Sequence, residues 1–220
     1  MKYPRSSVAV EGLPFVGSFL FLAWVAAFLS LKIASVVFIA FALFTLYFFR
    51  DPERKTPTDS DTAVISPADG RVIEVENDTE ETFLDKKEVK RVSIFMSPLS
   101  CHVNRSPVTG KVVALKYTPG KFIAANLKST SRSNERLAML METEAGEKIT
   151  VAQVAGFIAR RIVSYVEIGD KLSRGERFGM IRFGSRADLY LSLRTEVVVK
   201  KGDSVKSGET IIGYLKGENE

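Results

Sequence analysis

The sequence predicts a mostly β protein, in which a pseudo-symmetric β-sandwich or barrel-like domain follows a hydrophobic helical hairpin. Three observations support this fold class. The first is an almost uncharged stretch at residues 13–49. The second is a series of short segments with period-two alternation from residue 63 onward, a pattern typical of half-buried strands. The third is a Gly-Asp turn pattern that occurs twice near the C-terminus.

Residues 1–12 form a short N-terminal tail, and residues 13–49 are the predicted hairpin. Lys32 is the one charged residue within the hairpin. A single helix across this stretch would be about 55 Å long, whereas the hydrocarbon core of a bilayer is about 30 Å thick. Two short helices joined near Ser30–Lys32 therefore fit better. A signal peptide does not fit, because the apolar stretch is too long and no small-residue cleavage site follows it.

The charges around the hairpin predict its orientation. Basic residues flank both of its ends, at Lys2, Arg5, Arg50, Arg54 and Lys55. The tip carries only Lys32, so the positive-inside rule predicts the N-terminus and everything after residue 50 on the cytoplasmic side of the cell membrane. The formal net charge of +5 suits an anionic membrane surface, and we expect no nucleic-acid partner. Two alternatives are a buried hairpin within a soluble core and a shallow hairpin in the membrane interface.

Residues 50–62 are charged and contain prolines, so they predict a linker. Residues 63–220 follow as one domain. Its clearest strand patterns are Arg71–Val75, Arg91–Phe95, Lys111–Leu115 and Lys148–Val151. Turns are predicted at Asp69-Gly70, Thr109-Gly110, Pro119-Gly120 and Ala145-Gly146. One helix is predicted around Phe122–Lys128, and residues 77–90 are predicted to form a surface loop or hairpin.

A repeat near the C-terminus predicts a two-fold arrangement. Val166–Glu176 and Val199–Glu209 share the pattern Gly-Asp-x-(apolar)-x-x-Gly-Glu, which resembles the turn of lipoyl- and biotinyl-carrier barrels. Two copies are too few for a solenoid, which needs at least three units. They suit a pseudo-symmetric sandwich whose halves close over each other.

The chain has one cysteine and one histidine. An intrachain disulfide and a multi-cysteine metal site are therefore excluded, and we expect no metal site. One interpretation of Cys101 is a thiol nucleophile, but apolar neighbours such as Val103 favour a small buried residue. His102 is a candidate general acid or base, because an imidazole titrates near neutral pH. The alternative is a buried structural histidine.

Four ordered motifs give the strongest functional signal. They are Ser66–Gly70, His102–Arg105 with Pro107 and Gly110, Gln153–Arg161, and Glu176–Arg186. Together they resemble the phosphatidylserine decarboxylase family in its short prokaryotic form, over roughly residues 60 to 215. The last motif contains Phe-Gly-Ser-Arg, whereas an isolated Gly-Ser pair would indicate only a turn.

The resemblance implies a proenzyme that cuts itself between Gly184 and Ser185. The Ser185 hydroxyl attacks the Gly184 carbonyl, and the resulting ester eliminates to leave a pyruvoyl group at residue 185. Gly184 lacks a Cβ, which eases the strained geometry of this attack. The large chain, 1–184, and the small chain, 185–220, would stay together as a heterodimer. The pyruvoyl ketone would form a Schiff base with the substrate and act as the covalent cofactor, with no external one required.

The resemblance also implies roles for two polar residues. His102 stands at the position of an active-site histidine, and Asp69 matches an aspartate that orients a histidine. Long-form members carry a second histidine three residues later, where this chain has Arg105. The base for self-cleavage is therefore open, and His102 is a candidate for both proton transfers. The alternative for Asp69 is a plain Asp-Gly turn.

The substrate that the resemblance implies is a phospholipid of the membrane, phosphatidylserine or archaetidylserine, which loses CO2 to become the ethanolamine lipid. Its phosphodiester and carboxylate groups require cationic partners. The candidate binding residues are Arg105, Lys121, Arg136, Arg160, Arg161 and Arg186. The alternative is that these side chains are solvated surface.

Two other functions stay open at this point. One is a pyruvoyl-dependent decarboxylase of another amino-acid substrate, although the membrane hairpin argues against a soluble substrate. The other is a non-enzymatic protein with a lipoyl-like barrel on a membrane anchor. A carrier barrel would present a modifiable Lys flanked by Met at a hairpin tip, and neither Gly-Asp turn has a Met-Lys pair.

Overall fold

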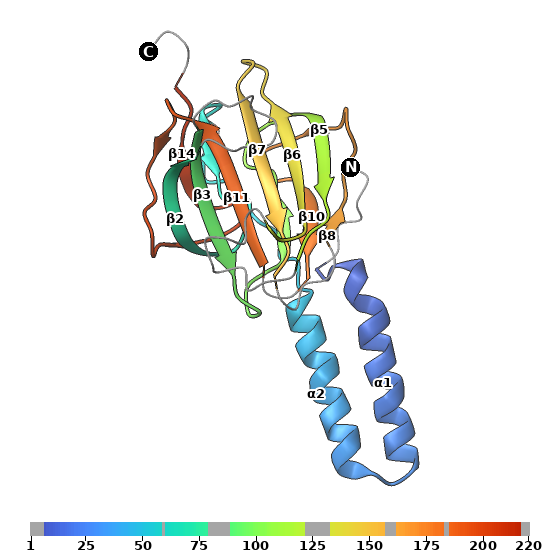
Figure 1. Cartoon of the computed structure of the whole chain (residues 1–220). Coiled ribbons are helices and arrows are strands. Elements are labelled where there is room, and N and C mark those ends of the chain that lie inside the picture. The colour runs from blue at the N-terminus through green and yellow to red at the C-terminus, as the bar shows by residue number, and fades with distance from the viewer. Residues whose placement is uncertain are drawn as a thin grey trace. The chain divides into compact units, whose positions relative to one another are not determined.

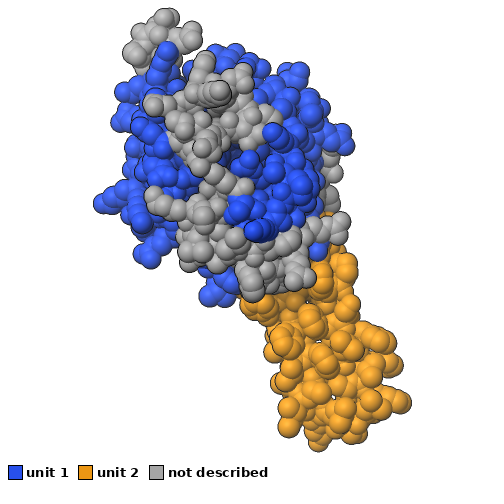
Figure 2. Space-filling model, in the orientation of Figure 1, with its two compact units in different colours: residues 1–3, 54–220 blue, residues 4–53 orange. Residues whose placement is uncertain are grey.

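The computed structural model describes residues 7–58, 60–78, 89–121, 133–156, 162–182 and 185–216. The chain forms two compact units, residues 4–53 and residues 54–220 with residues 1–3, which Figure 2 colours separately. The first unit is helical and the second is built from strands (Figure 1). Because strands dominate the described part of the chain, the predicted mostly β fold is confirmed.

The first unit is a helical hairpin. A short turn of 3-10 helix, η1 (Val10–Gly12), leads into α1 (Leu13–Phe28), and α2 (Lys32–Phe48) returns antiparallel to it (Figure 1). The two helices are joined at Ser30, which has a left-handed φ of 59°. The predicted hairpin, with its tip at residues 30–32, is therefore confirmed.

Small residues and one polar contact join the two helices. Ser35 Oγ on α2 donates a hydrogen bond to the carbonyl oxygen of Ala23 on α1, at 3.0 Å. The rings of Phe19 and Phe41 stack with their centroids 5.5 Å apart. Large apolar side chains on the outer faces, such as Trp24, are exposed. The segment Val10–Phe28 is long and apolar enough to cross a membrane, judged by its length and composition.

The described residues of the second unit form three sheets. Its strands in the described residues are β1 (Ala63–Ile65), β2 (Gly70–Asp78), β3 (Val89–Met96), β4 (Val103–Arg105), β5 (Gly110–Thr118), β6 (Arg136–Glu142), β7 (Lys148–Val154), β8 (Ile162–Ser164), β9 (Lys171–Leu172), β10 (Arg177–Ile181), β11 (Ser185–Ser192), β12 (Glu196–Val197), β13 (Ser204–Val205) and β14 (Ile211–Tyr214). Eight of them form one curved antiparallel sheet in the order β13-β2-β3-β11-β7-β6-β5-β9 (Figure 1). The two smaller sheets have the orders β1-β14-β12 and β4-β10-β8.

Strand β11 lies inside the large sheet. It pairs with β3 from Ser185↔Met96 to Ser192↔Val89, and on its other side it pairs with β7. Its side chains alternate between the two faces of the sheet. Those that enter the main hydrophobic core are Ala187, Leu189 and Leu191. The strand that begins at the predicted cleavage point is therefore held on both edges.

The two Gly-Asp turns have the same geometry. Gly169 and Gly202 have φ values of 98° and 100°, which an L side chain rarely adopts. The N–H of Gly169 donates to the carbonyl of Val112, and the N–H of Gly202 donates to that of Val72, both at 2.8 Å. The following short strands also match, because β9 pairs with the start of β5 and β13 pairs with the start of β2. These equivalent contacts are the pseudo-symmetry that the sequence predicts.

The predicted turns at Asp69-Gly70 and Thr109-Gly110 form a second related pair, and the sequence analysis did not predict this relation. Ser66 and Ser106 each start a Ser-Pro-x-x-Gly turn, and each hydroxyl donates to the carbonyl two residues ahead at 2.7 Å. The residue before each serine donates its backbone N–H to the proline carbonyl of the other turn, at 2.9 Å from Ile65 and 3.0 Å from Arg105. The two halves of the domain are thus joined reciprocally at this point.

The other local predictions are mostly confirmed. The four predicted strand segments lie within β2, β3, β5 and β7. Within residues 77–90 the two ends are strand rather than loop, since β2 and β3 pair as far as Asp78↔Val89, and the hairpin interpretation is the correct one. The helix predicted around Phe122–Lys128 lies outside the described residues. Strand β6 was missed because its core residues form an apolar run without alternation.

Candidate functional site

Ser185 is the first residue of β11 and is fully buried. Its side chain lies on the face of the large sheet that carries Ala187, which is part of the main core. The Ser185 hydroxyl lies 4.0 Å from Met96 Sδ, its neighbour across the strand pair. A thioether sulfur at this distance is a weak acceptor. Among the described residues, no strong hydrogen bond holds the hydroxyl away from reaction.

The peptide bond that is predicted to be cut precedes Ser185. Strand β10 ends at Ile181, and β11 begins at Ser185, so the predicted cleavage point lies between two strands of different sheets. Phe183 and Gly184 lie outside the described residues.

His102 lies just before β4 and is fully buried. Its carbonyl oxygen accepts a hydrogen bond from the N–H of Ile181, the last residue of β10, at 3.3 Å. This bond attaches the histidine to the strand that leads to Ser185. Burial is compatible with a proton-transfer residue, and it is equally what a structural histidine would show.

Two buried amides join the motifs around Ser185. Gln153 Nε2 on β7 donates to Asn104 Oδ1 on β4 at 2.8 Å, which links the large sheet to a small one. Asn104 Nδ2 donates to the Pro67 carbonyl at 3.3 Å and lies 3.6 Å from Met96 Sδ. Met96 is in turn the residue opposite Ser185. The structure thus brings together three motifs that the sequence analysis could only place in order, and it adds Asn104 and Gln153 as buried members of the site.

Asp69 binds two partners that the sequence analysis missed. Its Oδ1 accepts the backbone N–H of Ser207 at 2.7 Å, and its Oδ2 pairs with Arg54 at 2.9 Å. Arg54 also reaches Glu209 Oε1 at 3.2 Å. Burial lowers the pKa of Arg54, but the attraction of Asp69 and Glu209 outweighs it and raises the pKa above its ordinary value. The guanidinium therefore stays charged and holds the Asp69 carboxylate in place.

Arg54 is a residue that local sequence patterns do not single out. It stands in the proline-containing linker, where a charge normally indicates solvated chain. Its partners lie far along the chain, at residues 69 and 209. The contact forms because the linker packs against the second Gly-Asp repeat, which ends at Glu209.

The Thr109 turn is the pseudo-symmetric counterpart of the Asp69 turn. Thr109 Oγ1 accepts the backbone N–H of Arg174 at 3.1 Å, as Asp69 Oδ1 accepts that of Ser207. The geometry is repeated, but only the Asp69 copy has a carboxylate. This difference is consistent with a role for Asp69 beyond that of a turn residue.

The predicted basic residues do not gather at one place. Arg186 is 1% exposed and forms a bidentate ion pair with Asp188, both N–O distances being 2.9 Å. Since Arg186 and Arg136 both pair with Val154, they share one face of the large sheet, opposite to the face of Ser185. Lys121 is exposed.

Of the remaining basic residues, one lies at the end of β4 and two lie outside the described residues. Arg105 is buried and donates to the Gly175 carbonyl at 3.0 Å. Arg160 and Arg161 lie outside the described residues. The binding of a lipid head group by these six basic residues therefore stays a prediction.

Cys101 is a free, buried cysteine, in agreement with the prediction of a small buried residue. In the part of the chain that the structure describes, no group of three or more His, Cys, Asp or Glu residues could hold a metal ion.

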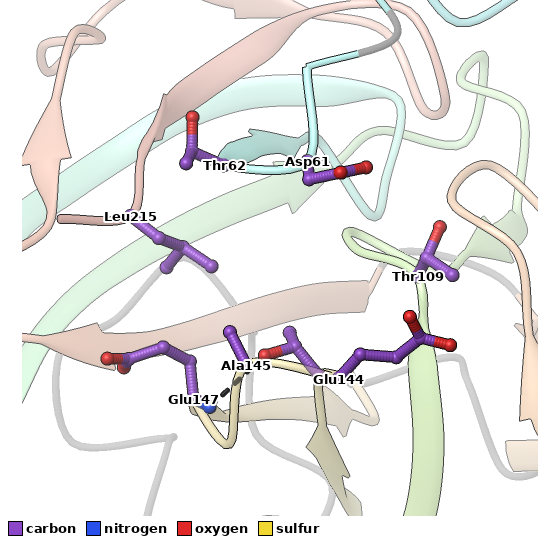
Figure 3. A pocket seen from close by; sticks show the side chains of 8 residues that line it. Asp61, Thr62, Thr109, Glu144, Ala145, Glu147 and Leu215 are labelled. Carbon is purple, nitrogen blue, oxygen red and sulfur yellow. Dashed lines mark hydrogen bonds between the residues drawn. The ribbon is translucent and has the colours of Figure 1, made fainter. Parts of the chain in front are cut away.

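A cavity of about 280 Å³ opens at another place in the same unit (Figure 3). Its lining residues are Asp61, Thr62, Thr109, Thr143, Glu144, Ala145, Glu147 and Leu215. The lining includes three carboxylates and no cation, and none of the predicted site residues. An anionic head group is therefore not expected to bind there.

Comparison with known proteins agrees with the motifs. The family model of phosphatidylserine decarboxylase matches residues 41–213. The chain is 46% identical to the phosphatidylserine decarboxylase proenzyme of Desulfotalea psychrophila over 215 aligned residues. The alignment covers 98% of this chain and 100% of the relative. The proenzymes of Syntrophotalea carbinolica and Geotalea uraniireducens are 44% and 46% identical, with the same coverage. This chain therefore belongs to the phosphatidylserine decarboxylase family.

Proposed function

We propose that this chain is a membrane-associated proenzyme that cuts itself between Gly184 and Ser185 and then converts phosphatidylserine to the ethanolamine phospholipid and CO2. Its relatives carry the name of this decarboxylase over their full length, so the non-enzymatic carrier is not retained. The observation that carries the proposal is the buried Ser185 hydroxyl at the start of β11, beside which side chains and carbonyls of the other motifs meet.

Self-cleavage needs a serine hydroxyl that is free to react and a backbone that is fixed in position beside it. Ser185 Oγ attacks the Gly184 carbonyl carbon, the amide C–N bond breaks, and the nitrogen takes up the hydroxyl proton. Loss of the Cα proton and cleavage of the Cβ–O bond then release the Gly184 carboxylate and leave dehydroalanine. One water molecule hydrolyses its imine tautomer to the ketone and ammonia. The weak contact of Ser185 with Met96 supports this proposal, because it leaves the hydroxyl available.

The small chain has to remain in place after the cut. Strand β11 is paired along β3 and along β7, and β13 and β14 pair with β2 and β1 of the large chain. These ladders support a heterodimer of residues 1–184 and 185–220, since residues 185–220 are too few to fold alone.

A pyruvoyl group at residue 185 would supply a ketone for the primary amine of the substrate and an acceptor for the electron pair that CO2 leaves behind. The chain's own residues then have to bind the head group and return a proton. His102 is the proposed proton donor, and Asp69, held by Arg54, is the proposed orienting carboxylate. The basic residues Arg105, Lys121, Arg136, Arg160, Arg161 and Arg186 are the proposed pool of phosphate and carboxylate ligands.

We further propose that the helical hairpin anchors the protein in the cell membrane, with the catalytic domain on the cytoplasmic side. The exposed apolar faces of α1 and α2 support this, because large apolar side chains such as Trp24 and Phe28 are otherwise unfavourable in water. The basic residues at both ends of the hairpin support the orientation.

The first test replaces the proposed nucleophile. Ser185→Ala should remain a single band of full length on a denaturing gel, because no hydroxyl is available to attack the Gly184 carbonyl. The wild-type chain should give a large chain ending at Gly184 and a small chain whose first residue is blocked and carries a ketone, as seen by intact mass. Ser192→Ala, at the far end of the same strand, is the control and should cut normally. Cutting of Ser185→Ala at the same bond would contradict the proposal.

The second test removes the hairpin. A chain that starts at residue 50 should still cut itself, because all four motifs and Arg54 are retained, and it should stay in the supernatant when membranes are pelleted. The full-length chain, carried through the same fractionation, should pellet. If the shortened chain still pellets after a high-salt wash, another surface is the main anchor.

The third test concerns His102. His102→Ala should lower decarboxylation by about 10²–10⁴-fold, the usual contribution of a general acid or base, and should also slow self-cleavage. Turnover of matured protein and the rate of maturation are measured separately across a range of pH. Wild-type rates for both steps would make His102 a structural residue and would direct the search for the base toward Asp69 or a bound water.

The fourth test concerns the linker arginine. Arg54→Gln leaves the Asp69 and Glu209 carboxylates without their cation, so the free energy of unfolding should fall by about 1.5–3 kcal/mol. Urea unfolding of the Ser185→Ala protein, with and without the second change, measures this on an uncut chain. Lys55→Gln, an exposed neighbour with the same charge change, should be nearly neutral. Equal effects of the two changes would show that Arg54 acts only through net charge.

A further inference from the structure

The amide oxygen of Gln153 has no hydrogen-bond partner within the part of the chain that the structure describes, although the side chain is fully buried. Gln153 lies on β7 directly opposite Ala187, which is two residues after Ser185 on β11. Residues two apart on a strand share a face, so Gln153 and Ser185 are diagonal neighbours on the same face of the sheet. Such neighbours are within reach of a long side chain.

The orientation of the Gln153 amide follows from a chain of hydrogen bonds. The Pro67 carbonyl can only accept, so the side-chain group of Asn104 that contacts it, at 3.3 Å, must be the Nδ2 donor. Asn104 Oδ1 therefore faces Gln153 and accepts from Gln153 Nε2 at 2.8 Å. The Gln153 oxygen is left over, and rotating the amide would place two acceptors against each other.

Gly179 on β10 leaves room for the amide in this place. A Cβ at residue 179 would lie 2.9 Å from Gln153 Nε2 and 3.2 Å from Gln153 Oε1. It would also lie 2.6 Å from the carbonyl oxygen of Val163, so the backbone could not yield cheaply. The glycine of the cleavage-site motif thus makes room for a polar group from another motif. An apolar side chain of the same length would fill this space without leaving an acceptor unpaired.

A buried acceptor without a donor is unfavourable and calls for an explanation, which for an atom beside residue 185 is a ligand or a reaction at that residue. The ligand must bring an N–H or O–H donor to the face that carries residue 185. An amide oxygen attracts donors and gives no attraction to a phosphate or a carboxylate. Gln153 would therefore distinguish the amine end of a serine head group from its two anionic ends.

We propose that Gln153 is a substrate-binding residue whose Oε1 accepts a hydrogen bond from the primary amine that arrives at residue 185. This inference rests on the proposed function, because it needs an amine-bearing substrate at that position. The hydrogen bond to Asn104 orients the acceptor, and Gly179 leaves the space that it occupies. The ligand class is a primary amine on an anionic lipid head group.

The test compares Gln153→Met with the wild-type protein after maturation. Met has a similar length and neither oxygen nor nitrogen. Reductive trapping of phosphatidylethanolamine on the small chain, followed by intact mass, should need about 10-fold or more lipid for half-maximal labelling in this variant. Competitive inhibition of turnover by phosphatidylglycerol, which has no amine, should be unchanged.

A matched control lies on the same strand. Thr150 is fully buried on β7, its Oγ1 also has no partner among the described residues, and its position places it on the opposite face of the sheet. Thr150→Val should label like the wild type. Equal labelling of Gln153→Met and wild type would overturn the proposal. Equal weakening of phosphatidylethanolamine and phosphatidylglycerol binding would also overturn it, because the amide would then be structural.

A second variant decides the matter if Gln153→Met does not mature. Gln153→Glu keeps the shape, and its buried carboxyl, when protonated, still donates to Asn104 Oδ1 and still offers a free acceptor oxygen, so its labelling by phosphatidylethanolamine should match that of the wild type. A 10-fold loss in this variant would reject the assignment. Failure of the proposed function looks different, because the wild-type chain itself would then give no ketone-bearing small chain.

Discussion

The backbone ladder around β11 is the constraint on which the rest of the structure depends. The strand that begins at Ser185 is paired on both edges, with β3 and with β7, and its inner face is part of the main core. A chain that cuts itself at this strand loses covalent continuity at a buried point. The ladders and the core must therefore supply the cohesion that the peptide bond no longer does. This explains how the residue proposed to be reactive can stand inside a sheet rather than on an exposed loop.

A second constraint is the polar contact between the sheets. Gln153 on the large sheet and Asn104 on a small one share a 2.8 Å hydrogen bond, and both side chains are buried. A buried amide that loses its partner is costly, so the bond fixes how the two sheets face each other. His102 lies two residues before Asn104 on the same segment, and Met96 lies directly opposite Ser185 on the neighbouring strand. The relative position of the proposed catalytic groups is thus set by side-chain amides as well as by strands.

The two pseudo-symmetric halves share the same backbone turns but differ in the side chains at the proposed site. The Ser66 and Ser106 turns and the two Gly-Asp turns repeat the same backbone hydrogen bonds. What differs is the side chain that caps the neighbouring turn, a carboxylate at Asp69 and a hydroxyl at Thr109. Arg54 adds a cation beside the carboxylate. The repeated backbone hydrogen bonds stabilise both halves of the domain. The Arg54–Asp69 ion pair lies in the half that contains Asp69.

The sequence by itself determined the helical hairpin, the main strands and the identity of the motif residues. These are local properties, since apolar length, period-two alternation and Gly-Asp turns depend on neighbours in the chain. The tertiary structure alone revealed the Arg54–Asp69 pair, the Asn104–Gln153 bond and the position of Arg136 and Arg186 on the face of the large sheet opposite to Ser185. Each of these depends on strand register and on the packing of one sheet against another. A shift of one residue in pairing would turn every side chain of a strand to the opposite face, and no local pattern specifies that pairing between distant segments.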